Sequence, residues 1–193
     1  MAWKAINATL LLILAGCGRF PPDTYDNHIC QVVQSHWGWA KPLRHVSEEY
    51  HISPGLVLSV IFHESSFRAQ ARPERKSVLG FVPWTVSSAY GYGQIKDETW
   101  AWYKSHRPGY FQSRTQFSDT VDFIGWYYQI FRRKNPLESF NDMQVARDFY
   151  FAYHEGLGGY QRKTYASQAW LINKAERVAK RASEYNQQLV NCL

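Results

Sequence analysis

The chain of 193 residues lacks any apolar run of the 18 or so residues that a membrane-spanning helix needs, which excludes a polytopic membrane protein. Glycine and proline are also few, at 12 and 8 residues, while 45% of the residues are hydrophobic. These proportions exclude collagen-like, low-complexity and disordered chains. Acidic residues are fewer than basic ones, 16 against 22, and the net charge of +6 favours an anionic partner.

Cysteine is scarce, and the first of the three cysteines has a distinctive setting. A positive residue, Lys4, precedes an apolar stretch of about ten residues, which is the length of a signal peptide. Cys17 directly follows Leu-Ala-Gly at the end of this stretch, and the pattern resembles a bacterial lipobox, in which the cysteine is lipidated. The alternative is a plain secretory signal. We predict a signal peptide at 1–16, a tether at 17–25 and one domain at 26–193.

The other two cysteines, Cys30 and Cys192, lie near opposite ends of this domain. Disulfides persist in exported proteins, so we expect a bridge between them. The bridge would close a loop of 162 positions, and chain entropy values such a loop at roughly 5 kcal/mol as an upper figure. The alternative is two buried thiols.

Apolar residues recur at helical spacing through most of the domain, with no internal repeat and no alternating strand run longer than four residues. The pattern predicts helices from about residue 26, through Leu43 to Tyr50, and from Ser53-Pro54, Asp97, Ser118, Asp142 and Thr164. Residues 69–93 lose this periodicity and predict a long functional loop. The predicted fold class is all-α, or mainly α with a small irregular or β element near 78–95.

Glu64 is the sharpest candidate for chemistry. It follows Ile61 by three residues and Val57 by seven, so it lies on the apolar face of the helix that begins at Ser53-Pro54. Burial on this face disfavours the charged carboxylate, and the protonated form is the one that a general acid needs. The alternative is a surface glutamate at a frayed helix end.

Two later motifs carry a family resemblance. Gly91-Tyr92-Gly93-Gln94-Ile95 has glycines that let the backbone approach a ligand, and Ala152-Tyr153-His154-Glu155-Gly156 lies at the end of a predicted helix. With Glu64-Ser65 they occur in the order typical of lytic transglycosylases with a lysozyme-like fold, and the chain resembles that family over roughly residues 50–160. The chain departs from the family pattern at Gly93, His154 and Glu155, where Met, Asn and Ala are usual.

The resemblance implies a lysozyme-like fold and assigns roles to individual residues. Glu64 would protonate the glycosidic oxygen between N-acetylmuramic acid and N-acetylglucosamine, and then take a proton from the muramoyl 6-hydroxyl as a 1,6-anhydro ring closes. The N-acetyl group can stabilise the anomeric carbon, so one carboxyl group suffices. Tyr153 would hydrogen-bond Glu64, while Ser65 and Gln94 would position the sugar or its acetamido group. A structural alternative remains open for each residue. Tyr153 would then be a core tyrosine, Ser65 a polar residue at a helix end and Gln94 a residue that stabilises the loop.

Other residues near the motifs are also candidates for the site. Tyr90, Tyr92 and Trp84 lie in or beside the glycine-rich loop and are expected to stack on sugar faces. Glu155 is interpreted as a surface charge, and the alternative is a second carboxyl group in the cleft, which would allow hydrolysis with water. His154 and the other histidines show no metal-ligand spacing, so neither a metal nor a cofactor is expected.

The predicted partners are peptidoglycan glycan strands, a membrane reached through the lipid anchor, and an envelope-complex protein. Nucleic acid is disfavoured because the chain is exported. The C-terminal segment is basic at Lys174, Arg177, Lys180 and Arg181, which favours anionic wall or lipopolysaccharide surfaces. Gly18 after the lipobox cysteine is typical of sorting to the outer membrane, facing the periplasm. The competing functions are a lysozyme-like hydrolase of peptidoglycan and a non-catalytic cell-wall-binding envelope module.

Overall fold

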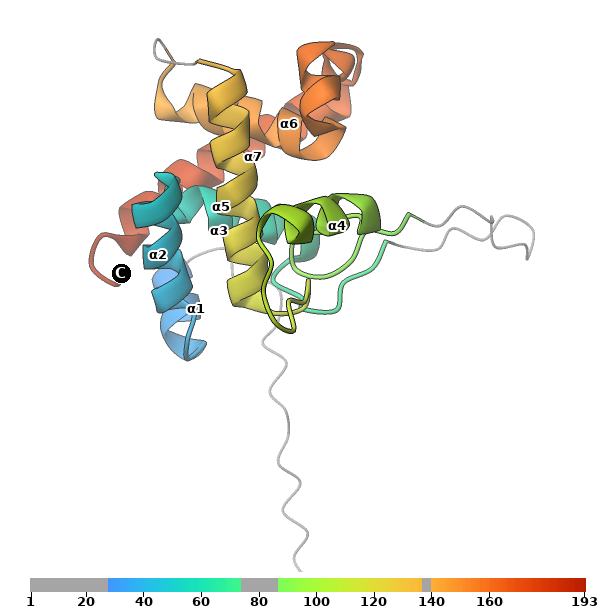
Figure 1. Ribbon diagram of the computed structural model, residues 1–193. Helices are drawn as coiled ribbons and strands as arrows, with labels where there is room; N and C mark the ends of the chain where they lie inside the picture. The colour runs from blue at the N-terminus through green and yellow to red at the C-terminus, as the bar shows by residue number, and fades with distance from the viewer. Residues whose placement is uncertain (1–27, 74–86, 137–139) are drawn as a thin grey trace, which may run out of the picture.

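The computed structural model describes residues 28–73, 87–136 and 140–193. These residues form seven α-helices and one short 3-10 helix (Figure 1): α1 (Ile29–Ser35), α2 (Ala40–Tyr50), α3 (Pro54–Ser65), α4 (Asp97–His106), α5 (Phe117–Lys134), α6 (Asp142–Gln161), η2 (Thr164–Ser167) and α7 (Ala169–Leu189). The predicted signal peptide and tether, with Cys17, lie outside the described residues. So does most of the predicted loop at 69–93, including Trp84.

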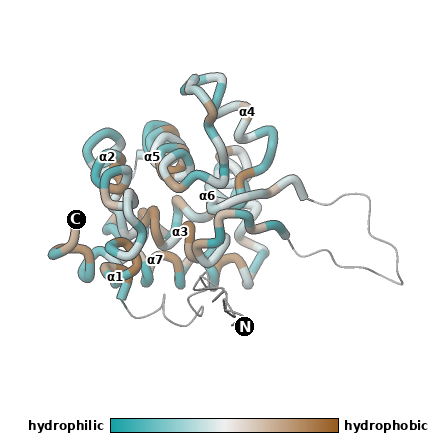
Figure 2. The backbone as a smooth tube through the Cα atoms, turned by 90° about the horizontal axis from the view of Figure 1, so that it is seen from below, coloured by the Kyte–Doolittle hydropathy of each residue, from teal (hydrophilic) through white to brown (hydrophobic). Residues whose placement is uncertain are grey.

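Helix α3 is the buried centre of the fold and packs along α7. The tube in Figure 2 is brown, hydrophobic, along α3 and largely teal, hydrophilic, along α2. Two hydrogen bonds join α3 to α7: the buried Ser59 hydroxyl donates to the Val178 carbonyl at 2.8 Å, and the Gly55 N–H donates to Oδ1 of Asn186 at 2.8 Å. A Cβ atom at position 55 would collide with Asn186. Glycine therefore permits the close approach of the two helices.

Four predicted helix starts, at Ser53-Pro54, Asp97, Ser118 and Asp142, lie within one residue of the observed starts, whereas the helix expected from about residue 26 begins at Ile29. Ser53 caps α3 as predicted, because its hydroxyl accepts the Leu56 N–H. Asp97 is the first residue of α4, and Lys96 precedes it as the cap position. Asp142 is likewise the first residue of α6, and Asn141 before it forms a reciprocal capping box with the side chain three residues on. An acidic residue in the first turn also stabilises the positive end of the helix dipole.

The end of α6 contains a kink, and the chain after it differs from the prediction. Gly156 has φ 76° and ψ 160°, which interrupts the helical backbone inside α6. The helix continues after this kink to Gln161. Thr164 begins a single 3-10 turn, η2, and the last long helix begins only at Ala169.

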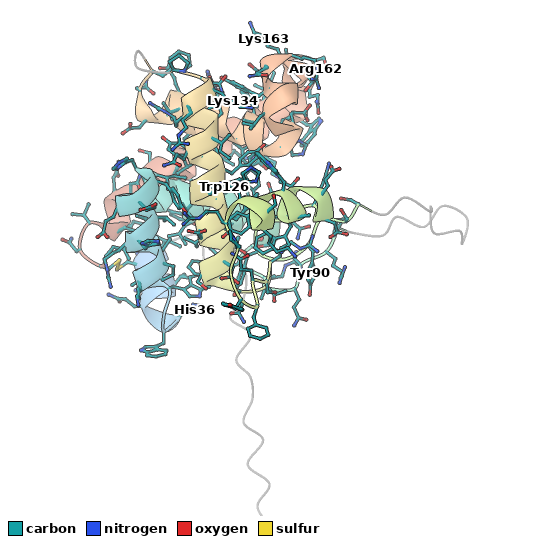
Figure 3. The ribbon with its side chains drawn as sticks, in the orientation of Figure 1. His36, Tyr90, Trp126, Lys134, Arg162 and Lys163 are labelled. Carbon is teal, nitrogen blue, oxygen red and sulfur yellow. A yellow bond between two sulfur atoms is a disulfide. The ribbon has the colours of Figure 1, made fainter. Side chains whose placement is uncertain are left out.

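A disulfide joins Cys30 in α1 to Cys192 beyond α7, with their Cα atoms 5.9 Å apart. Beside it, the Ile29 N–H donates to Oε1 of Gln188 at 2.8 Å. These contacts fasten the first described helix to the end of the chain. The yellow sulfur–sulfur bond is visible in Figure 3.

The all-α fold class is confirmed. Within the described residues the β structure is an isolated bridge between Tyr90 and Ile95. None of the described helices is long and apolar enough to cross a membrane.

Candidate active site

Glu64 lies one residue before the end of α3, where the buried helix reaches a cleft. The preceding apolar residues, among them Val57, Val60 and Ile61, are fully buried. Ser66 closes the helix in a left-handed conformation, with its N–H donating to the Phe62 carbonyl. The side chain of Glu64 is only 12% exposed. The local sequence therefore presents a largely desolvated carboxyl group at the wall of the cleft.

Two side chains from other helices contact the Glu64 carboxyl group. The Tyr150 hydroxyl of α6 donates to Glu64 Oε1 at 2.5 Å. Nζ of Lys174, from α7, lies 3.5 Å from the same oxygen. Three helices thus converge on one carboxyl group.

Tyr150 is held as a donor by its surroundings. Burial, and then the negative charge of Glu64, raise the pKa of the Tyr150 hydroxyl far above its ordinary value. The hydroxyl therefore keeps its proton at any physiological pH. The Lys174 ammonium also lies 5.4 Å from the centre of the Tyr150 ring, within cation–π range.

The predicted hydrogen bond from Tyr153 to Glu64 is wrong. The Tyr153 hydroxyl donates instead to the Gly93 carbonyl at 2.7 Å, and burial raises its pKa well above the ordinary value. Tyr153 thereby ties α6 to the glycine-rich loop, while Tyr150 contacts Glu64. Sequence reasoning missed Tyr150, although it precedes Tyr153 by three residues and so lies on the same side of α6.

The other missed residue is Lys174. The sequence predicts that Lys174 belongs to a basic surface for anionic polymers, but its ammonium group lies 3.5 Å from Glu64 Oε1. The sequence does not show which lysine of a basic helix points into the fold and which points to solvent.

Gln94 lines the cleft, whereas Ser65 does not belong to its described wall. Gln94 has a left-handed backbone (φ 47°), and its amide donates to the carbonyls of Ala71 and Gly91, each at 2.9 Å. Ser65 is 2% exposed, and its hydroxyl donates to the Ile61 carbonyl inside α3. Because Ser65 points into the fold, its predicted contact with sugar is wrong in this structure.

Tyr90 and Tyr92 also lie apart from the described wall of the Glu64 cleft. The Tyr90 ring, below α4 in Figure 3, lies under the Arg72 guanidinium, whose Cζ is 4.1 Å from the ring centre. Tyr92 packs edge-on against Trp39 and Phe117, with ring centres 6.0 and 5.7 Å apart. An arginine thus covers one face of the Tyr90 ring, and the Tyr92 ring packs on the core.

The cleft has a volume of about 460 Å³. Its wall comes from the end of α3, the glycine-rich loop, the start of α4, the middle of α5 and the kinked part of α6. The carboxyl, amide, ammonium and imidazole side chains in the wall are those of Glu64, Gln94, Lys96, Glu98, His154 and Glu155. Phe123 and Tyr127 give it an apolar side, and burial raises the pKa of the Tyr127 hydroxyl to about 12.

Glu155 is not the surface charge that we expected. Its side chain is 15% exposed and lines the same cleft as Glu64. It also accepts hydrogen bonds from three side chains, those of His154, Thr164 and Gln168. The structure therefore places Glu155 in the same cleft as Glu64, and the wall of this cleft also contains Glu98.

Across residues 28–73, 87–136 and 140–193, no cluster of three or more His, Cys, Asp or Glu side chains could hold a metal ion. The polar groups that the cleft offers are proton donors and acceptors. Such a set suits acid–base chemistry on a polar substrate.

The chain belongs to the transglycosylase SLT domain family, whose model matches residues 5–192. Neither the curated proteins nor the solved structures gave a match to the chain. The family acts on peptidoglycan in the bacterial envelope, and its fold is all-α and lysozyme-like, as the described helices are. The family match thus supports a lytic transglycosylase acting on peptidoglycan.

Proposed function

We propose that this protein cleaves the glycosidic bond between N-acetylmuramic acid and N-acetylglucosamine in peptidoglycan and leaves 1,6-anhydro ends. The observation that carries the proposal is the desolvated Glu64 carboxyl group at the cleft wall, held by Tyr150 and Lys174. One such group is enough when the substrate supplies its own hydroxyl and acetamido groups.

In the first step, protonated Glu64 gives its proton to the glycosidic oxygen. The bond between this oxygen and the muramoyl anomeric carbon breaks, and its electron pair stays on the oxygen. Glu64 becomes a carboxylate, which the Tyr150 hydroxyl and the Lys174 ammonium stabilise. These contacts strengthen as the proton leaves, so they lower the barrier rather than only binding the ground state.

In the second step, the Glu64 carboxylate takes the proton of the muramoyl 6-hydroxyl. The hydroxyl oxygen bonds to the anomeric carbon and closes the 1,6-anhydro ring. The carboxyl group is then protonated again and ready for the next bond. No water is consumed, so the products are lighter by one water than those of hydrolysis.

Gln94 and Tyr153 are proposed to shape the sugar-binding wall. The Gln94 side chain fixes the loop through the Ala71 and Gly91 carbonyls, and its amide oxygen offers an acceptor for an acetamido N–H. The Tyr153 hydroxyl holds the Gly93 carbonyl. Both contacts keep the loop in place before substrate arrives.

The experiment is digestion of purified sacculi by the wild type and by Glu64→Gln, followed by mass spectrometry of the released muropeptides. Anhydro-muropeptides from the wild type and at least a 100-fold lower yield from Glu64→Gln are expected. Glu184→Gln is the matched control, because Glu184 is exposed on α7 and pairs with Lys180. Equal release by wild type and Glu64→Gln contradicts the assignment and favours a non-catalytic wall-binding module.

Hydrolysis with water is the second candidate, and the observation that favours it is Glu155 in the same cleft. The two candidates differ in their products. If the digest yields muropeptides with a free reducing end and no anhydro form, the protein is a hydrolase.

The protein is further proposed to be a lipoprotein, anchored through Cys17 in the outer membrane and facing the periplasm, where an envelope-complex protein positions it. The support is the Leu-Ala-Gly-Cys sequence at the end of the apolar stretch. Metabolic labelling with a fatty acid tests this: the wild type should take up label and Cys17→Ala should not. Label in both variants contradicts it.

A further inference from the structure

Glu155 has an environment unlike that of Glu64, although the two share a cleft. Its Oε2 accepts hydrogen bonds from the Thr164 hydroxyl and, at 3.1 Å, from the Gln168 amide. Its Oε1 accepts one from Nδ1 of His154 at 3.0 Å. Residues of η2 and of the segment before α7 thus hold the carboxylate in one orientation.

The backbone explains how these donors reach Glu155. The residue after it, Gly156, has a positive φ of 76°, where side chains are strained and glycine is not. Beyond this kink α6 ends at Gln161 and Lys163 has a left-handed backbone (φ 56°), after which η2 packs against α6. Residues nine and thirteen positions after Glu155 can then donate to it, although a straight helix would carry them away.

The three donors keep Glu155 ionised. The Thr164 hydrogen bond is the largest cause and lowers the pKa of the carboxyl group below its ordinary value, with smaller contributions from His154 and Gln168. A carboxylate has about four acceptor sites, and three are taken, which leaves one for a group in the cleft. Glu64, in contrast, has one hydroxyl donor and one ammonium neighbour.

A continuous set of contacts joins the two carboxyl groups. The Tyr150 ring, whose hydroxyl bonds Glu64, lies 6.5 Å from the His154 ring, centre to centre. His154 in turn bonds Glu155 and packs edge-on against Trp170 at 5.1 Å. Tyr150 and His154 are four residues apart, so one turn of α6 serves both carboxyl groups.

We propose that Glu155 is a further catalytic residue, a fixed negative charge that faces the cationic anomeric carbon while Glu64 carries the proton. The inference rests on the proposed function, because it assumes a transition state with positive charge at that carbon. The donors suit this role and not that of a base: a carboxylate stabilised by three hydrogen bonds takes up a proton poorly near neutral pH. Two carboxyl groups in different environments thus have different tasks.

The test compares the wild type, Glu155→Gln and Thr164→Val on soluble glycan strands, measuring kcat, KM and the form of the product. Glutamine keeps the shape of the side chain: its oxygen can accept from Thr164 and Gln168, and its amide can donate to His154. We expect kcat of Glu155→Gln to fall roughly 100-fold with KM within about 2-fold, as for loss of a preorganised electrostatic group. The thermal midpoint should stay within a few degrees of the wild type.

Thr164→Val distinguishes charge from structure. It removes one donor to Glu155 but leaves the negative charge in place. The proposal predicts a loss in kcat at least ten times smaller than that of Glu155→Gln. Equal losses in the two variants, with equally lowered thermal midpoints, show that Glu155 only fastens the kink and overturn the proposal.

The remaining outcomes separate the inference from the proposed function. If Glu155→Gln keeps the kcat of the wild type while Glu64→Gln no longer forms anhydro product, the inference alone is overturned. Hydrated product from the wild type that disappears in Glu155→Gln makes Glu155 a base for water and overturns both. A wild type that releases no product overturns the proposed function, and the inference with it.

Discussion

The hydrogen bond from Tyr150 to Glu64 gives the most informative single-atom perturbation. Tyr150→Phe removes the hydroxyl that donates to Glu64 Oε1 at 2.5 Å and keeps the ring that packs under Lys174. Tyr150 is fully buried, so water does not readily replace the lost donor. The change therefore removes one stabilising contact of the Glu64 carboxylate and has little effect on the packing of the ring.

The expected magnitude follows from the type of hydrogen bond. A bond to a charged group contributes about 1.5–3 kcal/mol. In the proposed mechanism this stabilisation is greatest when Glu64 has lost its proton. Its loss should lower kcat roughly 10- to 100-fold, at about 1.4 kcal/mol per factor of ten. KM should change little, because the hydroxyl is directed at Glu64 and not at the sugar.

The assay is steady-state release of muropeptides from soluble glycan strands, with thermal unfolding measured in parallel. Tyr153→Phe is the comparison, because it removes a hydroxyl of the same helix that bonds the Gly93 carbonyl. It should raise KM more than it lowers kcat, since the loop loses an attachment. If folded Tyr150→Phe keeps kcat within about 3-fold of the wild type, the role assigned to Tyr150 is refuted.

Three further outcomes are expected. Lys174→Met should lower kcat more than Lys174→Arg, because arginine keeps the positive charge near Glu64; equal kcat values for the two variants would contradict this. Reduction of the Cys30–Cys192 disulfide should destabilise the fold by about 2–5 kcal/mol, seen as a lower thermal midpoint; an unchanged midpoint would contradict it. The lowered pKa of Glu155 means that its ionised form stabilises the fold above the ordinary value of 4.5, and that this is lost as the pH falls through the lower folded-state value. The wild type should therefore exceed Glu155→Gln in unfolding free energy at pH 7 but not near pH 2, and a difference that persists in acid would argue against it.

The helices that sequence predicted best are those whose apolar pattern and capping residue agree. Ser53 and Pro54 mark the start of α3, and the buried stripe that follows leads to Glu64. The exact first residue of a helix is predicted less accurately, because neighbouring polar residues such as Asn141 and Asp142 both suit a helix start. The last helix began late because Thr164 opens a 3-10 turn, which has the same kind of starting residue as an α-helix.

The candidate site was predictable only in part, because its contacts join distant segments. The pattern identified Glu64, but its hydroxyl donor lies 86 positions later and its ammonium neighbour 110 positions later. Tyr150 and Tyr153 occupy the same side of α6, and only the tertiary packing decides which of them contacts Glu64. The environment of Glu155 could not be predicted for the same reason: two of its donors lie 9 and 13 positions later, beyond the kink at Gly156 and the end of α6.

The central claim is that Glu64 passes a proton to the leaving sugar and takes one back from the 6-hydroxyl, without water. Digestion of sacculi in water enriched in oxygen-18 tests this most directly. The wild type should release anhydro-muropeptides that carry no label from the cleavage, and Glu64→Gln should release almost none. Labelled reducing ends from the wild type, or undiminished unlabelled product from Glu64→Gln, would contradict the account.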